Sequence, residues 1–300
     1  MKTTRRHFAE MLRKKWMQAM LALILCLPFA IGISLLLKSW PLLSLAEIRN
    51  ILFTAEWMPT QGQFGMLTFI VSSVAVSLIG LVLMIPVCLA SSIYITQFAS
   101  PWLSRRLRSV IDILAGIPSV IFGLWGVITV VPWVAELAAG WGARNTTGFS
   151  ILAAGIVVAV SVMPFVLNML IELFESVSLE LKETALSLGA SHWQAVRDVI
   201  LKKLKPGIIA AFTLGESKAF GETIAVLMVV GNVVQRPRGL FDAGYPLPSL
   251  LANNYGEMMS IPLYDAALML SALILLLIVI AFNFLAHRLI RLYTSPFSNQ

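Results

Sequence analysis

The sequence has 300 residues, of which 58% are hydrophobic and only 12% are charged. A soluble domain carries about 25% charged residues, so this composition excludes a soluble protein and indicates one that lies in lipid. The net charge of +7 comes from short basic clusters between apolar runs, a distribution typical of membrane orientation and not of nucleic-acid binding. Cys26 and Cys88 both lie in apolar runs. We therefore expect free, buried thiols, with neither a disulfide nor a metal site.

A membrane-crossing helix needs about 20 predominantly apolar residues. Six segments meet this requirement, and they cover residues 17–37, 66–91, 110–132, 150–171, 208–230 and 264–287. The first is longer than the apolar region of a cleaved signal peptide, which has roughly 7–15 residues, and it lacks a small-residue cleavage site. The sequence therefore predicts an all-α, polytopic membrane protein with six transmembrane helices, the first of which is not cleaved.

Lysine and arginine are distributed unequally between the connecting segments. If the N-terminus is inside, the inner segments hold 16 of these residues and the outer segments hold 5, with Lys218 left inside a span. Because basic residues accumulate on the cytoplasmic side, both termini are predicted to be cytoplasmic. The chain then divides into an N-terminal segment with the first span and outer loop (1–65), a transmembrane core (66–287) and a cytoplasmic tail (288–300).

The cytoplasmic loop of residues 176–205 has the pattern of two helices joined by a turn. Ser178 is a candidate cap for a helix over residues 179–188, and Gly189 is a usual helix-ending residue. The following Ser191 and Gln194 match a capping box, which predicts the start of a second helix.

In the second helix of this loop, Trp193, Val196 and Ile200 share one face, as in an amphipathic helix. Pro206 and Gly207 are the candidates for its end, because proline disrupts a helix interior. Two interpretations remain open at this point: a connector lying on the membrane surface, or a compact docking element for a cytoplasmic partner.

The fifth predicted span contains three ionisable residues, Glu216, Lys218 and Glu222. An ionisable group at mid-membrane costs roughly 2.5–3.5 kcal/mol, so it normally faces a bundle interior or water. Lys218 and Glu222 are four residues apart and are predicted to share a helix face. They form either an ion pair that fixes packing or a charged element in the path of an anion. Glu216 lies on a different face, and we expect it to reach toward water.

The cytoplasmic loop of residues 176–205 resembles a loop of ABC importer permeases in which an "EAA" triplet is followed by a glycine. The matching residues here are Glu183, Thr184, Ala185, Gly189 and Ala190, followed by Val199, Ile200 and Leu201. The resemblance implies a type I importer permease bundle, in which this loop inserts into a cleft of a separate ATPase subunit and couples it to transport.

Two further segments are similar to phosphate ABC importer permeases of the PstC type. Residues 218–228 match the family's "R-A-x-G-E-T-x-A-V" span, and residues 114–124 match its "LAGIPSVVYGLFG" segment. The resemblance implies translocation of inorganic phosphate across a bacterial inner membrane. It assigns translocation to Lys218 and Glu222, and it makes candidates for the pathway or its packing of Gly116, Pro118, Ser119, Gly221 and Thr223.

The same resemblance implies the partners: a second, PstA-like permease, a pair of ATP-binding subunits, an external phosphate-binding protein and membrane lipid. Lys218 stands where the family has arginine, so the charge is kept but the bidentate fork that suits phosphate is lost. A permease for another oxyanion is therefore the alternative within this class.

Several kinds of chemistry lack a sequence pattern. The chain has no G-x-x-x-x-G-K-[ST] phosphate loop, and no nucleophile and base set is suggested. The three histidines have no metal-ligand spacing. We therefore expect a transport subunit without catalytic, cofactor or metal sites, with ATP and magnesium bound by the partner ATPase. A secondary carrier or channel that uses Lys218 and Glu222 as an ion relay is the alternative from another class, and an intramembrane enzyme is a weaker one.

One more acidic residue, Asp112, begins the third predicted span close to Arg105, Arg106 and Arg108. We expect it to form an ion pair at the membrane surface.

Overall fold

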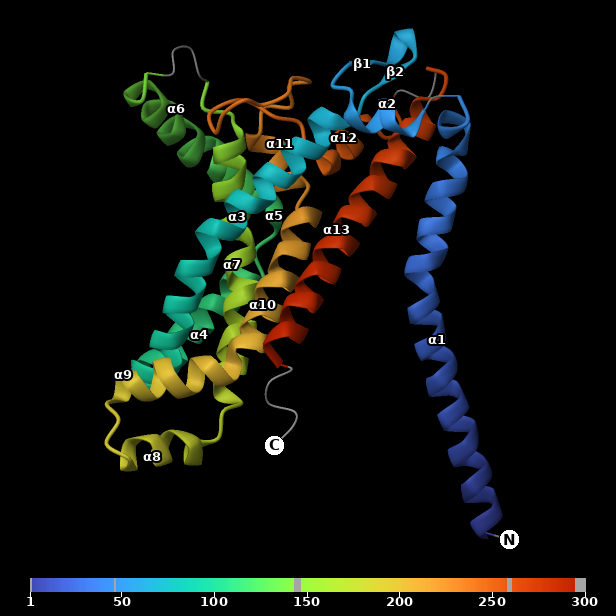
Figure 1. Cartoon of the computed structure of the whole chain (residues 1–300). Helices are drawn as coiled ribbons and strands as arrows, with labels where there is room; N and C mark the ends of the chain where they lie inside the picture. Colours follow the sequence, from blue (N-terminus) through green and yellow to red (C-terminus); the bar gives the residue numbers. More distant parts are fainter. Residues whose placement is uncertain (1, 46, 143–146, 258–260, 295–300) are drawn as a thin grey trace.

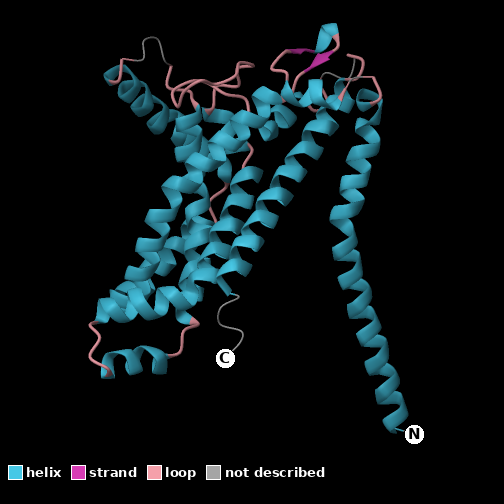
Figure 2. Ribbon diagram, in the orientation of Figure 1, coloured by secondary structure: helices cyan, strands magenta, loops and turns pink. Residues whose placement is uncertain are grey.

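The computed structural model describes residues 2–45, 47–142, 147–257 and 261–294. The fold is almost entirely α-helical (Figures 1 and 2). The helices are, in chain order, α1 (Lys2–Leu43), α2 (Ile48–Phe53), α3 (Leu67–Ile93), α4 (Pro101–Ala115), α5 (Ser119–Trp125), α6 (Val131–Gly140), α7 (Ile151–Glu175), α8 (Leu179–Ser187), α9 (His192–Gln194), α10 (Leu201–Gly221), α11 (Ile224–Val229), α12 (Leu247–Asn254) and α13 (Tyr264–Thr294).

Shorter elements join these helices. One is an antiparallel pair of two-residue strands, β1 (Trp57–Met58) and β2 (Gln63–Phe64), connected by the 3₁₀ turn η1 (Pro59–Gln61). The others are π-helical turns that extend or link α-helices, namely η2 (Tyr94–Phe98), η3 (Gly126–Val130) and η4 (Ala195–Ile200). Turns of this kind inside helices are rare and are frequent at functional sites.

Helix α7 is the centre of the bundle and contacts α3, α4, α10 and α11. Of its apolar stretch 61% is buried, compared with 33% for α3 and 28% for α13. Glycines let the neighbouring helices approach. A Cβ at Gly155 of α7 would meet the side chain of Ile79 in α3, and one at Gly215 of α10 would meet Val166 of α7. Small residues of this kind are common where membrane helices pack closely.

Helix α1 stands at the edge of the fold and contacts α13 (Figure 1). None of the 18 residues in its most apolar window is buried within the chain. Contact is made toward its C-terminal end, where Gly32 lies against Leu276 and Leu42 joins an apolar cluster with Tyr264. The two helices diverge below this point in Figure 1. Most of the α1 surface is therefore left for lipid or for another subunit.

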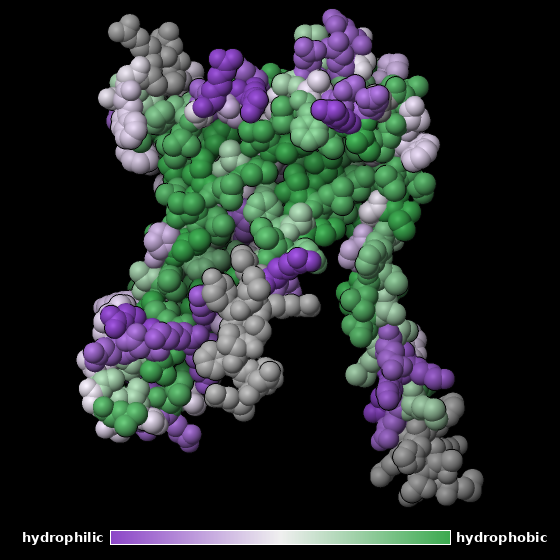
Figure 3. Space-filling model, in the orientation of Figure 1, coloured by the Kyte–Doolittle hydropathy of each residue, from purple (hydrophilic) through white to green (hydrophobic). Residues whose placement is uncertain are grey.

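The molecule has the layered surface of a membrane protein. Figure 3 shows a hydrophobic band over the middle of the helices, between hydrophilic regions at both ends. Figure 1 places the first residues of α1, the last turn of α13 and helices α8 and α9 at one end of the bundle. The β1–β2 pair and α12 lie at the opposite end. The first residues of α1, the last turn of α13 and the loop of residues 176–205 thus share a side, while the assignment of that side to the cytoplasm stays a prediction.

Five helices within the described residues are long and apolar enough to cross a membrane: Glu10–Leu43, Leu67–Phe98, Ser119–Gly140, Ile151–Glu175 and Tyr264–Arg288. The prediction of a third span over 110–132 was wrong in its position. Residues up to Ala115 belong to the charged helix α4, and residues 116–118 are not helical. The apolar helical segment begins at Ser119 and ends at Gly140.

The fifth predicted span, residues 208–230, is not one continuous helix. It consists of the last part of α10 and the short α11, separated by Glu222 and Thr223. The predicted total of six crossings therefore stays a prediction, with α10 and α11 as a broken sixth segment.

Candidate functional site

The loop of residues 176–205 folds as the sequence predicts, into helix α8, a glycine turn and a second helix. Gly189 has a φ of +88°, a left-handed conformation that glycine adopts without steric cost. The capping box is formed, because the Ser191 hydroxyl accepts from the Gln194 backbone N–H and the Gln194 side chain accepts from the Ser191 N–H. Ser178 occupies the cap position of α8, but its side chain makes no capping bond.

The tip of this loop exposes apolar side chains at an otherwise hydrophilic end of the molecule. Leu188 is 84% exposed, Leu179 is 74% exposed and Trp193 is 49% exposed. Among the residues that match the loop of ABC importer permeases, Glu183, Thr184 and Gly189 are also exposed. Ala185 is buried and Ala190 is half-buried. Apolar side chains exposed at this end are compatible with an interaction surface for another protein.

Gln97, in the π-helical turn η2 at the end of α3, connects this loop to the bundle. Its side-chain oxygen accepts a hydrogen bond from Lys182 Nζ at 3.1 Å, and its backbone oxygen lies 2.9 Å from Nε2 of His192. The neighbouring Phe98 packs edge-to-face against the His192 ring, with centroids 4.8 Å apart. One turn of α3 therefore contacts both helices of the loop, a role that the sequence analysis missed because Gln97 lies in no recognised motif.

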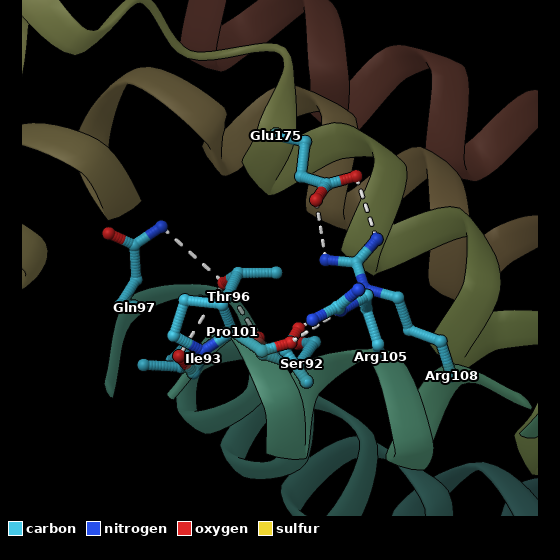
Figure 4. Close-up of polar contacts among 9 residues, drawn as sticks. Ser92, Ile93, Thr96, Gln97, Pro101, Arg105, Arg108 and Glu175 are labelled. Atoms are coloured by element: carbon cyan, nitrogen blue, oxygen red, sulfur yellow. Dashed lines mark hydrogen bonds and ion pairs between the residues drawn. The ribbon is translucent and has the colours of Figure 1, made fainter. Parts of the chain in front are cut away.

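A second polar link, between α4 and α7, appears in the same close-up as Gln97 (Figure 4). Arg108 of α4 donates to both carboxylate oxygens of Glu175, at 2.8 and 2.5 Å, and so joins α4 to the end of α7. The prediction that Asp112 pairs with a nearby arginine was wrong, because its Oδ1 accepts instead from Nδ2 of Asn168 at 3.0 Å. The Arg108–Glu175 ion pair therefore holds α4 against the point at which α7 leads into the loop.

The sequence predicts that the second helix of the loop ends at Pro206 and Gly207. This prediction was wrong, because the helix continues through both residues. Elements α9, η4 and α10 follow one another without interruption from His192 to Gly221, with Pro206 inside α10. At 1.5 Å per residue this helix is roughly 45 Å long. Val196 and Ile200 are buried against α3 and α7, and Trp193 is the partly exposed member of the predicted face. A single helix therefore runs from the exposed loop to Lys218.

The geometry around Lys218 differs from the predicted helix face shared with Glu222. Helix α10 ends at Gly221, and Glu222 has extended backbone angles (φ −72°, ψ 106°), so the two residues are not on one helical face. Within the described residues no ion pair joins them; Lys218 Nζ lies 4.7 Å from the centroid of the Phe165 ring. Lys218 is exposed in the single chain.

Two helix interruptions lie at corresponding positions in the fold. The first contains Gly116 and Pro118, just before α5, and the second contains Glu222 and Thr223, just before α11. Helices α5 and α11 pack in parallel: a Cβ at Gly123 would touch Ala225 and Met228, and one at Gly126 would touch Val229.

The predicted pathway residues therefore lie at the two breaks, at the same end of one helix pair. These residues are Gly116, Pro118, Ser119, Gly221 and Thr223. Each is exposed or half-buried in the single chain. Non-helical backbone at membrane depth is tolerated where it is buried in protein or lines a water-filled cavity. This arrangement is compatible with a polar pathway completed by another subunit.

The known proteins that this chain resembles in sequence include several that are named as transport permeases. The chain is 32% identical to the phosphate transport system permease protein PstC of Xylella fastidiosa (strain Temecula1), covering 76% of this chain and 74% of that one. It is 31% identical to the PstC protein of Pasteurella multocida (91% and 88% covered). It is 34% identical to the probable ABC transporter permease protein YqgH of Bacillus subtilis (69% and 66% covered).

The fold also resembles a chain of the MetNI methionine ABC transporter in an inward-facing conformation. The TM-score is 0.55 with 21% sequence identity, and the match covers 76% of this chain and 94% of that one. At this identity the likeness concerns the fold, which is that of an ABC type I importer permease.

A family match covers most of the chain. Residues 89–295 match the family described as "binding-protein-dependent transport system inner membrane component". That range contains the loop of residues 176–205 and both helix interruptions, and the five apolar helices make the chain a multi-pass inner membrane protein. The chain belongs to the family of binding-protein-dependent transport system inner membrane components.

Proposed function

We propose that this chain is the permease subunit of an ATP-driven importer that carries inorganic phosphate across the inner membrane. The observation that carries the proposal is the uninterrupted helix from the exposed loop to Lys218. Force applied to the loop by a cytoplasmic ATPase reaches the charged part of α10 through a rigid element. The PstC relatives, which are named as phosphate transport proteins, support the choice of substrate.

The coupling element consists of Glu183, Thr184, Ala185, Gly189 and Ala190, together with the exposed Leu188. Ala185 is buried and supports this surface from inside the chain. An apolar side chain that is 84% exposed at a hydrophilic end is stabilised when a partner removes it from water. The chain's own sequence has no phosphate loop for ATP. ATP and magnesium are therefore assigned to a pair of ATP-binding subunits that dock on this surface.

Lys218 and Glu222 form the proposed translocation site, at the end of α10 and in the break that follows it. An exposed ammonium at this depth attracts an oxyanion, and Glu222, half-buried nearby in the chain, limits how tightly the anion is held. The pathway is completed by a second, PstA-like permease, because Lys218 and both helix interruptions are open in a single chain. Phosphate is delivered from outside by a phosphate-binding protein.

Lys218 favours a second candidate within the same class, a permease for another oxyanion. Lysine is a compact point charge and lacks the planar fork with which arginine binds two phosphate oxygens at once. The motif surrounding it is otherwise that of the phosphate permeases. Phosphate is therefore the leading substrate, and sulfate or another tetrahedral oxyanion is the alternative.

Uptake of labelled phosphate by cells that depend on this system tests the proposal. Lys218→Ala should abolish most uptake while the chain and its co-purifying subunits stay at normal levels in the membrane. Lys38→Ala, which removes a lysine near the outer end of α1, is the matched control and should leave uptake unchanged. Full phosphate uptake by Lys218→Ala would exclude the assigned role, and saturable uptake of labelled sulfate through the native chain, with no uptake of labelled phosphate, would select the alternative substrate.

A further inference from the structure

Glu216 is a buried acidic residue on a face of α10 that the proposed transport mechanism does not use. Its side chain is 3% exposed, and neither carboxylate oxygen has a hydrogen-bond donor among the residues that the structure describes. The expectation that it reaches water was therefore wrong. A buried polar group without a partner is destabilising, by about 1–3 kcal/mol and more for a charged group. Such a group calls for a specific explanation.

The Glu216 side chain lines a cavity between helices α3, α10 and α13. The cavity has a volume of about 350 Å³, and its walls are almost entirely apolar, including Leu81, Ile85, Phe212, Phe282 and Leu285. Thr213, the other polar residue of the lining, uses its hydroxyl to donate to the backbone oxygen of Ile209. The carboxyl group is therefore the single unsatisfied polar group of the described lining.

The charged residues with described contacts on the neighbouring helices are directed elsewhere. Lys218 lies over Phe165 of α7, and Arg288 of α13 lies over Phe284. His287 contacts the backbone oxygen of Asn283. On α7, Glu175 is paired with Arg108 and Glu172 is exposed. Helix α3 carries no charged residue.

The polar residues next to Glu216 are also engaged. Asn283 donates to the hydroxyl of Ser217 at 2.9 Å and to the backbone oxygen of Val279. Ser217 in turn donates to the backbone oxygen of Thr213. This chain of bonds joins α10 to α13 beside the cavity, and no part of it includes the Glu216 carboxyl.

We propose that this cavity is a binding site for a small amphiphilic amine, whose ammonium nitrogen donates to the Glu216 carboxylate and whose apolar body fills the space between α3, α10 and α13. Ligand sites typically have volumes of about 300–1,000 Å³, apolar walls and a few placed polar groups, as this cavity does. A charge-assisted hydrogen bond is roughly twice as strong as a neutral one. The site is distinct from the proposed translocation site, because Lys218 faces α7.

Formation of the ammonium–carboxylate pair requires that one proton leave the Glu216 carboxyl group. A neutral amine takes the proton of the Glu216 carboxylic acid, whereas an ammonium ion displaces that proton to water. In both cases the product is the same ammonium–carboxylate pair. An alcohol of the same shape fills the cavity but cannot form this pair, and a carboxylate of the same shape is repelled. The three head groups on one apolar body therefore separate the chemistry of Glu216 from simple partition into lipid.

The test uses the full chain, purified with the subunits that accompany it and placed in lipid nanodiscs. Binding of cyclohexylamine, cyclohexanol and cyclohexanecarboxylate is measured by ligand-observed NMR. Infrared difference spectroscopy follows the carbonyl stretch of the protonated carboxyl group. Cyclohexylamine should bind saturably, at least about tenfold more tightly than the alcohol, a difference of about 1.4 kcal/mol. Its binding should remove the carbonyl band.

Two variants of the lining test the site itself. Glu216→Gln keeps the size of the side chain, and it should lose the amine preference and the infrared change. Ala286→Phe fills the cavity while leaving Glu216 in place, and it should lose binding of amine and alcohol alike. Glu172→Gln, an exposed glutamate on α7, is the control and should bind as the native chain does.

Equal, non-saturable uptake of all three compounds would overturn the proposal, and so would amine binding that survives Glu216→Gln. A cavity occupied by a side chain of a second subunit would bind none of the probes, which also overturns it. Because these measurements do not involve phosphate, they are independent of the proposed transport function. Failure of one proposal therefore leaves the other standing.

Discussion

Lys182 of α8 and Gln97 at the end of α3 are joined by a hydrogen bond of 3.1 Å across 85 residues of sequence. The Gln97 backbone oxygen also lies 2.9 Å from His192, which begins the second helix of the loop. The exposed loop is therefore attached to two helices of the bundle at once. It continues directly into α10, and it is bound to α3 through Gln97.

Replacing Gln97 should weaken coupling without removing the ATPase. In Gln97→Ala the side-chain acceptor for Lys182 is lost, at a net cost of about 0.5–1.5 kcal/mol for one hydrogen bond. Phosphate uptake should fall several-fold while the ATP-binding subunit still co-purifies and hydrolyses ATP. Gln61→Ala, at the exposed turn η1 on the opposite end, is the control. Unchanged uptake in Gln97→Ala would show that the Lys182 bond does not transmit the motion.

Charging the exposed tip of the loop should act on a different step. Leu188→Asp places a carboxylate on a surface that a partner is proposed to cover, and its desolvation costs far more than that of leucine. The ATP-binding subunit should be lost from the purified complex while the permease remains in the membrane. Leu240→Asp changes an equally apolar side chain, 53% exposed, at the other end and should keep the subunit. Retention of the ATPase by Leu188→Asp would contradict the assigned surface.

Gly189 provides a test of the loop's backbone. Its φ of +88° is unfavourable for any residue with a Cβ, and a strained residue of this kind costs of order 1–3 kcal/mol. Gly189→Val should reorient α8 and reduce both ATPase co-purification and uptake. Gly140→Val changes a glycine where no atom lies within 4 Å of the added Cβ and φ is not left-handed, so it should be tolerated. Equal behaviour of the two variants would show that the turn conformation is not required.

The continuity of the long helix can be broken at one residue. Proline at Ala210 removes a backbone hydrogen bond inside α10 and costs about 3 kcal/mol, compared with about 1 kcal/mol for glycine. Ala210→Pro should retain the ATPase on the loop but lose phosphate uptake. Ala210→Gly should lose much less of it. If both variants transport phosphate equally well, the motion does not reach Lys218 through α10.

Arginine at position 218 tests the choice of oxyanion. Lys218→Arg restores a planar fork that binds two oxygens of a tetrahedral anion. If phosphate is the substrate, uptake should be retained and half-saturation should occur at an equal or lower phosphate concentration. A loss of phosphate uptake with intact assembly would indicate that the site is shaped around the compact ammonium. That result would favour the alternative oxyanion.

Local features of this fold were predictable where local chemistry decides them. The apolar lengths located most of the spans, and serine, glutamine and glycine in the right order predicted the capping box and turn of the loop. The break at residues 116–118 carries a visible signal, since a glycine and a proline lie two residues apart there, yet the apolar window ran through it. At Pro206 the sequence predicted a helix end that does not occur. Helix α10 accommodates this proline because the surrounding helix is packed against α3 and α7.

Features that depend on distant parts of the chain were not predictable in the same way. Gln97 acquires its role from partners 85 and 95 residues away, and no motif marks it. Glu216 is buried because α3 and α13 enclose it, which the sequence of α10 alone does not indicate. The face shared by Lys218 and Glu222 failed for a related reason, because the helix ends between them. The comparisons support the family, while the roles of individual site residues stay predictions.

The contact between α1 and α13 has a consequence for how the protein is made. The two helices that pack here, with Gly32 beside Leu276, are far apart in the sequence. During synthesis α1 therefore enters the bilayer before α13 exists, and it stays without this neighbour until the residues between them have been made. The contact closes only once α13 has followed. A chain truncated before α13 would leave α1 unattached, as a lone hydrophobic segment open to membrane quality-control proteases.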